Sequence, residues 1–225
     1  GKTTLTEKLL LFGGAIQLAG QVRAKGDRRR TRSDWMSIER ARGISVVTSV
    51  MTFEYEGTVF NLLDTPGHED FSEDTYRVLT AVDSALMVID AANGVEAQTR
   101  RLIEVCRQRD TPIITFVNKM DREVREPVDL VDEIERTLGM SAVPFTWPVG
   151  MGKLFHGVYD RREKRMRVFS PGEDKAGGDD EILAGLDNAE AAKRFGAEFT
   201  QAQDELELLN GASPEFDRSA FLSGR

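Results

Sequence analysis

The first quarter of the chain follows a helical pattern and then a strand pattern. In Thr3–Leu11, Leu5 and Leu9 lie four residues apart and two further leucines widen the apolar face, which predicts a helix that breaks near Gly13–Gly14. Two strand-like runs, 46–55 and 58–63, then flank a Glu-Gly dipeptide. This arrangement predicts a β-hairpin.

Short apolar runs and longer amphipathic segments alternate through the middle of the chain. The apolar runs 85–90 and 112–118 are typical of strands buried on both faces of a sheet. Helical patterns cover 69–79, 96–108 and 128–138. This alternation predicts an α/β fold with a mostly parallel sheet and helices on both faces.

The pattern of hydrophobic and polar residues changes after Ser141. Three short strand patterns follow, a Gly/Asp-rich loop covers 172–180, and a long acidic helix is expected from Ala189 to Leu209; the strand patterns are 143–149, 154–159 and 165–169. We therefore expect a core in 1–140, an inserted α+β subdomain in 141–210, and a return toward the core in 211–225.

Composition changes this picture little. Hydrophobic residues make up 40% of the chain and the net charge is −8, so a packed core is expected and a general polyanion-binding or DNA-binding role is not. No apolar run approaches the roughly twenty residues that cross a bilayer. Cys106 is the one cysteine, cannot form an internal disulfide, and lies among apolar helix residues as a small core side chain. A reducing, cytoplasmic setting is expected.

One segment departs from the acidic balance. Residues 23–32 contain six cationic side chains: Arg23, Lys25, Arg28, Arg29, Arg30 and Arg32. They form either a solvated loop or a loop that orders beside the phosphates of a nucleotide or of RNA. Charge alone leaves both interpretations open.

The chain begins with Gly1-Lys2-Thr3-Thr4, followed directly by the predicted helix. This is the second half of a phosphate-binding loop, in which backbone N–H groups and the helix N-terminus hold phosphate. In that motif Lys2 neutralises phosphate charge and the Thr3 hydroxyl binds Mg²⁺. A tripeptide of this kind is weak evidence alone, because it often occurs by chance.

Two further motifs strengthen it. Asp64-Thr65-Pro66-Gly67 follows an apolar run. There a carboxylate can hold a magnesium-bound water, and a glycine N–H can face a terminal phosphate. The same four residue types also form ordinary turns. Asn118-Lys119-Met120-Asp121 follows a second apolar run. An aspartate there can accept hydrogen bonds from N1–H and the N2 amino group of guanine. The order of the three motifs predicts a GTP- and GDP-binding GTPase that uses Mg²⁺ rather than an ATPase or a kinase.

His68 directly follows the glycine of the second motif. A lone histidine is usually structural or merely exposed, but this position suits orientation of the attacking water. We therefore predict His68 and Lys2 as the catalytic residues, and His156 as incidental.

The run DTPGHEDF resembles the ribosome-dependent GTPases of translation. Arg42-Gly43-Ile44-Ser45 resembles the first switch segment of that family. The resemblance covers essentially the whole chain and is weakest from about 170 to 205. It implies that Gly1 to Thr4 bind phosphate, that Asp64 to His68 form the second switch, and that Asn118 to Asp121 read the base. Thr3 and Ser45 would ligate Mg²⁺, and Asp64 would do so through water. At the position of Ser45 most members of the family have a threonine.

Within the family, the runs 33–51, 68–90 and 147–160 are more similar to the member that acts in termination than to the translocating elongation factor. The resemblance then implies two partners: the ribosome, near its factor-binding site of large-subunit RNA and proteins, and the stop-codon-reading release factors that the protein would remove. Two alternatives remain, an elongation-factor-G-like translocation GTPase and a GTP-sensing module that does not depend on hydrolysis.

The chain opens inside a motif. In the family, a strand and a first glycine precede this point, while a loop over the guanine base and β-barrel domains would follow Arg225. We therefore expect a piece truncated at both ends.

Overall fold

In the computed structural model, the described residues are 1–16, 48–65, 72–169 and 181–224. They divide into two units. The first contains 1–16, 48–65, 72–85 and 104–111, and the second contains 86–103, 112–169 and 181–224. Each unit is described by itself.

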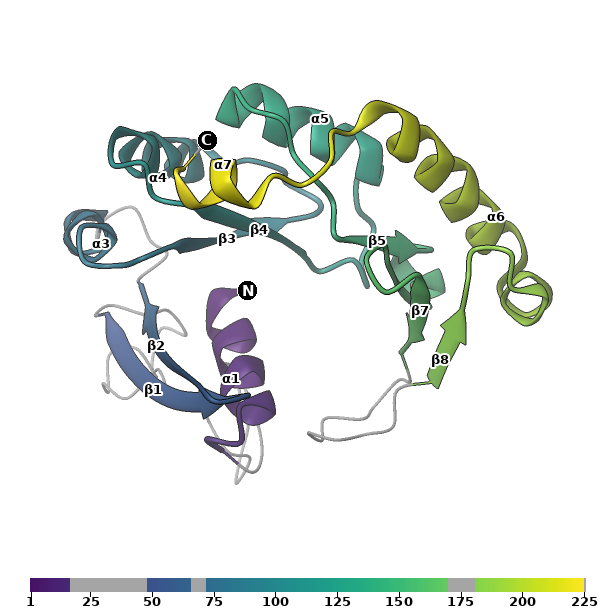
Figure 1. The fold of residues 1–225 in the computed structure, drawn as a ribbon, viewed down its shortest axis with the longest axis horizontal. Coiled ribbons are helices and arrows are strands. Elements are labelled where there is room, and N and C mark those ends of the chain that lie inside the picture. Colours follow the sequence, from purple (N-terminus) through teal and green to yellow (C-terminus); the bar gives the residue numbers. More distant parts are fainter. Residues whose placement is uncertain (17–47, 66–71, 170–180, 225) are drawn as a thin grey trace. The chain divides into compact units, whose positions relative to one another are not determined.

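The first unit contains a helix and a β-hairpin (Figure 1). Helix α1 spans Lys2–Phe12 and ends at Gly13, as the sequence predicts. Strands β1 (Ser49–Tyr55) and β2 (Thr58–Asp64) pair antiparallel. The turn residues Glu56 and Gly57 have φ of 48° and 74°. Positive φ at both central residues matches the right-handed twist of the strands, so the predicted hairpin is confirmed.

One side of this hairpin packs against α1. Leu10 and Leu11 of the helix are buried with Ile16, and Met51 and Phe53 of β1 pack against them. The Phe53 ring stacks on Phe60 of β2 with centroids 5.4 Å apart. Helix α3 (Ser72–Leu79) follows in the chain and lies within the predicted helix 69–79.

The second unit begins with a βαβα segment. Strands β3 (Ala85–Asp90) and β4 (Ile113–Asn118) form a two-stranded sheet, and helices α4 (Ala97–Gln108) and α5 (Pro127–Leu138) follow them in turn. Ala85 and the last residues of α4, from Glu104 on, are assigned to the first unit. Gly139 ends α5 in the left-handed conformation, with φ of 63°. These elements match the predicted ones to within a residue or so.

The core of this segment lies on one face of the sheet. Ile89, Val95 and Ile103 are buried together with Ile134 and Leu138 of α5. On the opposite face of the strands, the residues Leu86, Ile114 and Phe116 are 41%, 51% and 41% exposed. Within this unit the expectation of strands buried on both faces is therefore wrong, because the cluster covers only the side that carries Met87, Ile89, Ile113 and Val117.

A four-stranded antiparallel sheet forms the rest of the second unit. Its order is β5 (Thr146–Val149), β6 (Gly157–Asp160), β7 (Arg165–Val168) and β8 (Glu181–Ala184). The long helix α6 (Ala189–Ala212) packs on it, and Phe195, Phe199 and Leu206 meet the buried side chains of the strands. Gly196 interrupts α6 with φ of 52° and ψ of −122°. Glycine tolerates this non-helical conformation because it has no Cβ, so Gly196 allows α6 to bend there.

Three details differ from the sequence prediction. Strand β8 and the short helix α7 (Arg218–Leu222) were not predicted, since five or fewer residues carry little periodicity. The expected strand 154–159 begins only at Gly157, after the 3₁₀ turn η2 (Gly152–Leu154). The described strands form three separate sheets, within a mixed α/β chain. A single, mostly parallel sheet is therefore not seen in the described part of the chain.

Candidate functional site

The N-terminus of α1 suits an anion. The helix begins at Lys2, Gly1 is its N-cap, and among the described residues no side chain caps it and no acidic residue lies in its first turn. The first N–H groups of a helix point out of its end and carry the positive end of its dipole. An uncapped start rich in small and hydroxyl side chains therefore fits a phosphate group.

Lys2 and Asp64 influence one another within the first unit. Burial lowers the pKa of the Lys2 ammonium, and the negative charge of Asp64 partly opposes this by raising it. Asp64 ends β2 and is only 5% exposed, with Thr65 directly after it. The hairpin thus brings a carboxylate of the second motif into electrostatic range of Lys2 in the first motif.

The four residues after β4 form an ordered loop in the second unit. The Asn118 side chain accepts a hydrogen bond from the Lys119 backbone N–H through Oδ1, at 2.8 Å. Lys119 has φ of 71°, a left-handed conformation that a non-glycine residue adopts only when its surroundings hold it there. Met120 is buried, and its carbonyl accepts from Gly152 N–H at 2.8 Å. Asp121 is exposed.

This pattern presents the Asp121 side chain to a ligand. Asn118 and Met120 are occupied in holding the loop, whereas the Asp121 carboxylate is presented to solvent. A guanine base offers N1–H and the N2 amino group as donors on one edge, which a carboxylate can accept together.

Asp90 contacts the loop after β4 and was not singled out by the sequence. It ends β3 and forms an ion pair with Lys119. The hydrogen bond from Lys119 is the main reason that the pKa of Asp90 is lowered, with burial opposing it. Its signal in the sequence was a carboxylate at the end of an apolar run, the same signal that singled out Asp64.

Several predicted residues lie outside the described part of the chain. These are Ser45, Pro66, Gly67, His68 and the basic segment 23–32. The phosphate-side residues Gly1 to Thr4, Asp64 and Thr65 belong to the first unit, and Asn118 to Asp121 belong to the second. The described members of each group therefore lie in the same unit.

The remaining singled-out side chains have structural partners. The His156 ring lies 4.8 Å from the Phe195 ring, and its backbone N–H donates to Val149. Cys106 is buried, which raises the pKa of its thiol. Trp147 is 2% exposed and donates its indole N–H to Glu205. The predictions of an incidental His156 and a core Cys106 agree with these contacts.

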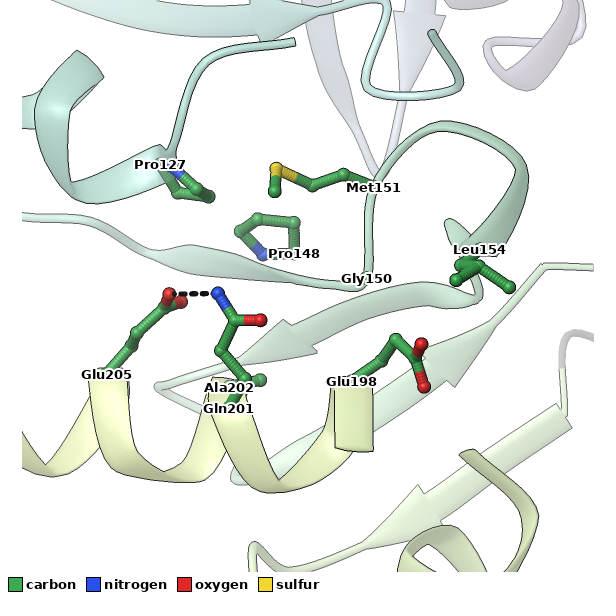
Figure 2. A pocket seen from close by; sticks show the side chains of 9 residues that line it. All are labelled: Pro127, Pro148, Gly150, Met151, Leu154, Glu198, Gln201, Ala202 and Glu205. Atoms are coloured by element: carbon green, nitrogen blue, oxygen red, sulfur yellow. Dashed lines mark hydrogen bonds between the residues drawn. The ribbon is translucent and has the colours of Figure 1, made fainter. Parts of the chain in front are cut away.

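A cavity of about 180 Å³ lies in the second unit (Figure 2). Its lining comes from the start of α5, the β5–β6 connection and α6: Pro127, Pro148, Gly150, Met151, Leu154, Glu198, Gln201, Ala202 and Glu205. Among the described residues, none that the sequence predicted as a ligand contact lines it. Met151 nevertheless reaches the loop after β4, because it packs against the cluster that contains Met120.

The described residues hold no group of three or more His, Cys, Asp or Glu side chains that could bind a metal ion. Within that same part of the chain, no helix has the length and apolar character needed to cross a membrane.

Comparison with known proteins places the chain in a family. The sequence profile of the family described as the elongation factor Tu GTP-binding domain matches residues 1–214. Proteins described as peptide chain release factor 3 are 69% identical over 225 residues in Bordetella petrii and 68% identical over 226 in Nitrosomonas eutropha. Each alignment covers all of this chain and 42% of the relative. The chain thus spans about two-fifths of the length of these relatives.

A solved structure is also similar. A protein from Thermus thermophilus matches with a TM-score of 0.72 and 26% sequence identity, over 98% of this chain and 32% of that one. The resemblance to translational GTPases drawn from the sequence is confirmed by the profile and by these relatives.

Proposed function

The chain belongs to the family of elongation factor Tu GTP-binding domains, and from this premise we propose that it is the GTPase domain of a termination factor. The whole protein hydrolyses GTP on the ribosome and promotes the departure of stop-codon-reading release factors. The observation that carries this proposal is the 69% identity over the whole chain to a peptide chain release factor 3.

The phosphate end of the nucleotide lies at the start of α1. The uncapped helix N-terminus and the ammonium of Lys2 receive the negative oxygens, and the burial of Lys2 strengthens its attraction to them. Thr3 and Ser45 would supply hydroxyl ligands for Mg²⁺, and Asp64 would hold it through water. The ion, when bound, would supply positive charge next to the phosphates.

This donor set fits Mg²⁺. The ion prefers oxygen ligands, keeps several waters, and binds through one or two carboxylates together with substrate phosphates. The buried carboxylate of Asp64, together with hydroxyl ligands, therefore suffices, and a cluster of acidic residues is not required. Gly1, Thr4, Thr65, Pro66 and Gly67 complete the contacts of this end.

Hydrolysis depends on the residue after the second motif. His68 orients the attacking water, and Lys2 stabilises charge on the phosphates. The base end is read by Asn118, Lys119, Met120 and Asp121, with the Asp121 carboxylate accepting from guanine. GTP orders both switch segments on the ribosome: the first contains the basic loop 23–32 and Arg42 to Ser45, and the second is Asp64 to His68.

The domain plan of the sequence prediction remains part of the proposal. Residues 1–140 form a GTPase core with a mostly parallel sheet between helices, 141–210 form the inserted subdomain, and 211–225 lead back to the core. The separate hydrophobic cluster of the four-stranded sheet and α6 supports the insertion. The partners are the ribosome and the release factors, and the protein acts in the cytoplasm without contacting membrane or DNA.

A reconstituted termination reaction with the full-length protein tests the function. The protein should speed GTP-dependent departure of a release factor from ribosomes that have already released their peptide. It should not advance tRNA by one codon. Translocation without this recycling would overturn the proposal in favour of an elongation-factor-G-like GTPase, and unchanged recycling with a non-hydrolysable GTP analogue through repeated cycles would favour a GTP-sensing module.

A further inference from the structure

Asp90 and Lys119 join the ends of two neighbouring strands. Asp90 is the last residue of β3, and Lys119 directly follows Asn118 at the end of β4. The Lys119 ammonium donates to the Oδ2 atom of Asp90. The side chains of Lys119 and Asp90 are 31% and 19% exposed, so the ion pair is partly shielded from water. Opposite charges attract one another more strongly in such a shielded place than at an open surface.

The carboxylate of Asp90 has a second bond that fixes its direction. Its Oδ1 atom accepts from the backbone N–H of Ala92 at 3.1 Å. The Asp90 carbonyl accepts from Gly94 N–H at 2.8 Å, which closes the turn after β3. The side chain is thus held by its own turn before it receives Lys119.

Backbone hydrogen bonds join the same two segments. Ala91 N–H donates to the Asn118 carbonyl at 3.0 Å, and Arg125 N–H donates to the Ala91 carbonyl at 3.2 Å. The residues on either side of the Lys119–Asp121 loop are therefore fixed to the turn that begins at Asp90. The left-handed backbone of Lys119 lies between these two points.

A left-handed backbone at a lysine requires compensation. Asn118 provides part of it, through the hydrogen bond from Lys119 N–H. The Asp90 carboxylate adds to it, because it holds the Lys119 side chain once the backbone has turned. Loss of this carboxylate would release Lys119 toward more common backbone conformations, and Asp121 is only two residues further on.

We propose that Asp90 is a positioning residue for guanine recognition: through Lys119 it sets the loop that presents Asp121. The proposal rests on the proposed function, since it assumes that this loop reads the base. Asp90 itself makes no contact with the nucleotide. It adds a specificity-determining residue at the end of β3, outside the three motifs.

The test uses the full-length protein and four forms: wild type, Asp90→Asn, Lys119→Met and the double variant. Dissociation constants for GDP and for inosine diphosphate, which lacks the N2 amino group, are measured for each. Asp90→Asn should weaken GDP binding about tenfold and bring the ratio of the two constants closer to one. The double variant should bind like Lys119→Met alone, because both changes remove the same interaction.

Two further variants separate positioning from general damage. Asp90→Glu keeps the charge and should recover part of the GDP affinity. Asp160→Asn is a matched control, because Asp160 also ends a strand and accepts from the backbone N–H groups of Arg162 and Glu163. It should leave the ratio unchanged. The ratio does not depend on the folded fraction, so it reports on the site even where a variant is less stable.

An unchanged ratio in Asp90→Asn, or losses that simply add in the double variant, would overturn the inference. Failure of the wild-type protein to prefer guanine nucleotides would overturn the proposed function instead. The two failures are distinguishable because only the second one involves the wild type.

Discussion

The backbone N–H of Gly152 donates to the carbonyl oxygen of Met120 at 2.8 Å. Gly152 begins the 3₁₀ turn between β5 and β6, whereas Met120 lies in the loop after β4. Met151, the neighbour of Gly152, packs against the same cluster as Met120. The segment between β5 and β6 therefore supports the loop that carries Asp121.

This contact predicts that Gly152→Ala weakens guanine nucleotide binding. Gly152 has φ of 60°, and an added Cβ would lie 3.3 Å from the carbonyl oxygen of Arg122. The left-handed conformation alone costs an L residue about 1–2 kcal/mol. Thermal unfolding and GDP titration should both show a loss. The control is Gly211→Ala, where an added Cβ meets no atom within 4 Å; a loss of the same size there would contradict the prediction.

Base specificity should depend on Asp121. In Asp121→Asn one carboxylate oxygen is replaced by an amide donor, so the N1–H and N2 amino donors of guanine lose an acceptor. An unpaired polar group of this kind typically costs about 1–3 kcal/mol. Competition between GTP and xanthosine triphosphate, which has an acceptor at C2, should shift toward the xanthine nucleotide.

The matched control for this change is Asp129→Asn, an exposed carboxylate in the first turn of α5. It should leave the preference for GTP unaltered. Retention of the wild-type preference by Asp121→Asn would show that the guanine assignment is wrong.

His68 should affect turnover far more than binding. A side chain that orients water contributes about 100- to 10,000-fold to rate, so His68→Ala should lower ribosome-stimulated hydrolysis by that order while GDP and GTP affinities stay near wild type. Single-turnover hydrolysis and nucleotide titration measure the two quantities. His156→Ala, which removes a ring packed on Phe195, should change stability without changing turnover. Equal losses of binding and turnover in His68→Ala would instead indicate a structural histidine.

The contact between Trp147 and Glu205 should stabilise the inserted sheet against α6. The indole Nε1 donates to Glu205 Oε2 at 2.7 Å, and Trp147 is 2% exposed. Glu205→Ala leaves a buried donor unsatisfied and should lower the free energy of unfolding by about 1–3 kcal/mol. Glu205→Gln retains an acceptor and should cost less.

Glu207→Ala on the exposed side of the same helix serves as the reference, and chemical denaturation compares all three variants. An equal effect of the Glu205 and Glu207 truncations would exclude a specific contribution of the Trp147 hydrogen bond.

The sequence alone determined the local elements and the chemistry of the site. The leucine spacing of α1, the Glu56–Gly57 turn and the αL glycine after α5 each depend on a few neighbouring residues. The three motifs identified the ligand class for the same reason, because phosphate and guanine are each bound by short segments whose spacing is visible along the chain.

Only the tertiary structure decided which distant residues act together. Asp90 and Lys119 are 29 positions apart, and Trp147 and Glu205 are 58 apart. The residues around each member of these pairs do not indicate which distant residue it contacts, because these contacts form only when strand ends and helices come together. The four-residue strand β8 was missed for a related reason: its pairing with β7, rather than its own periodicity, makes it a strand.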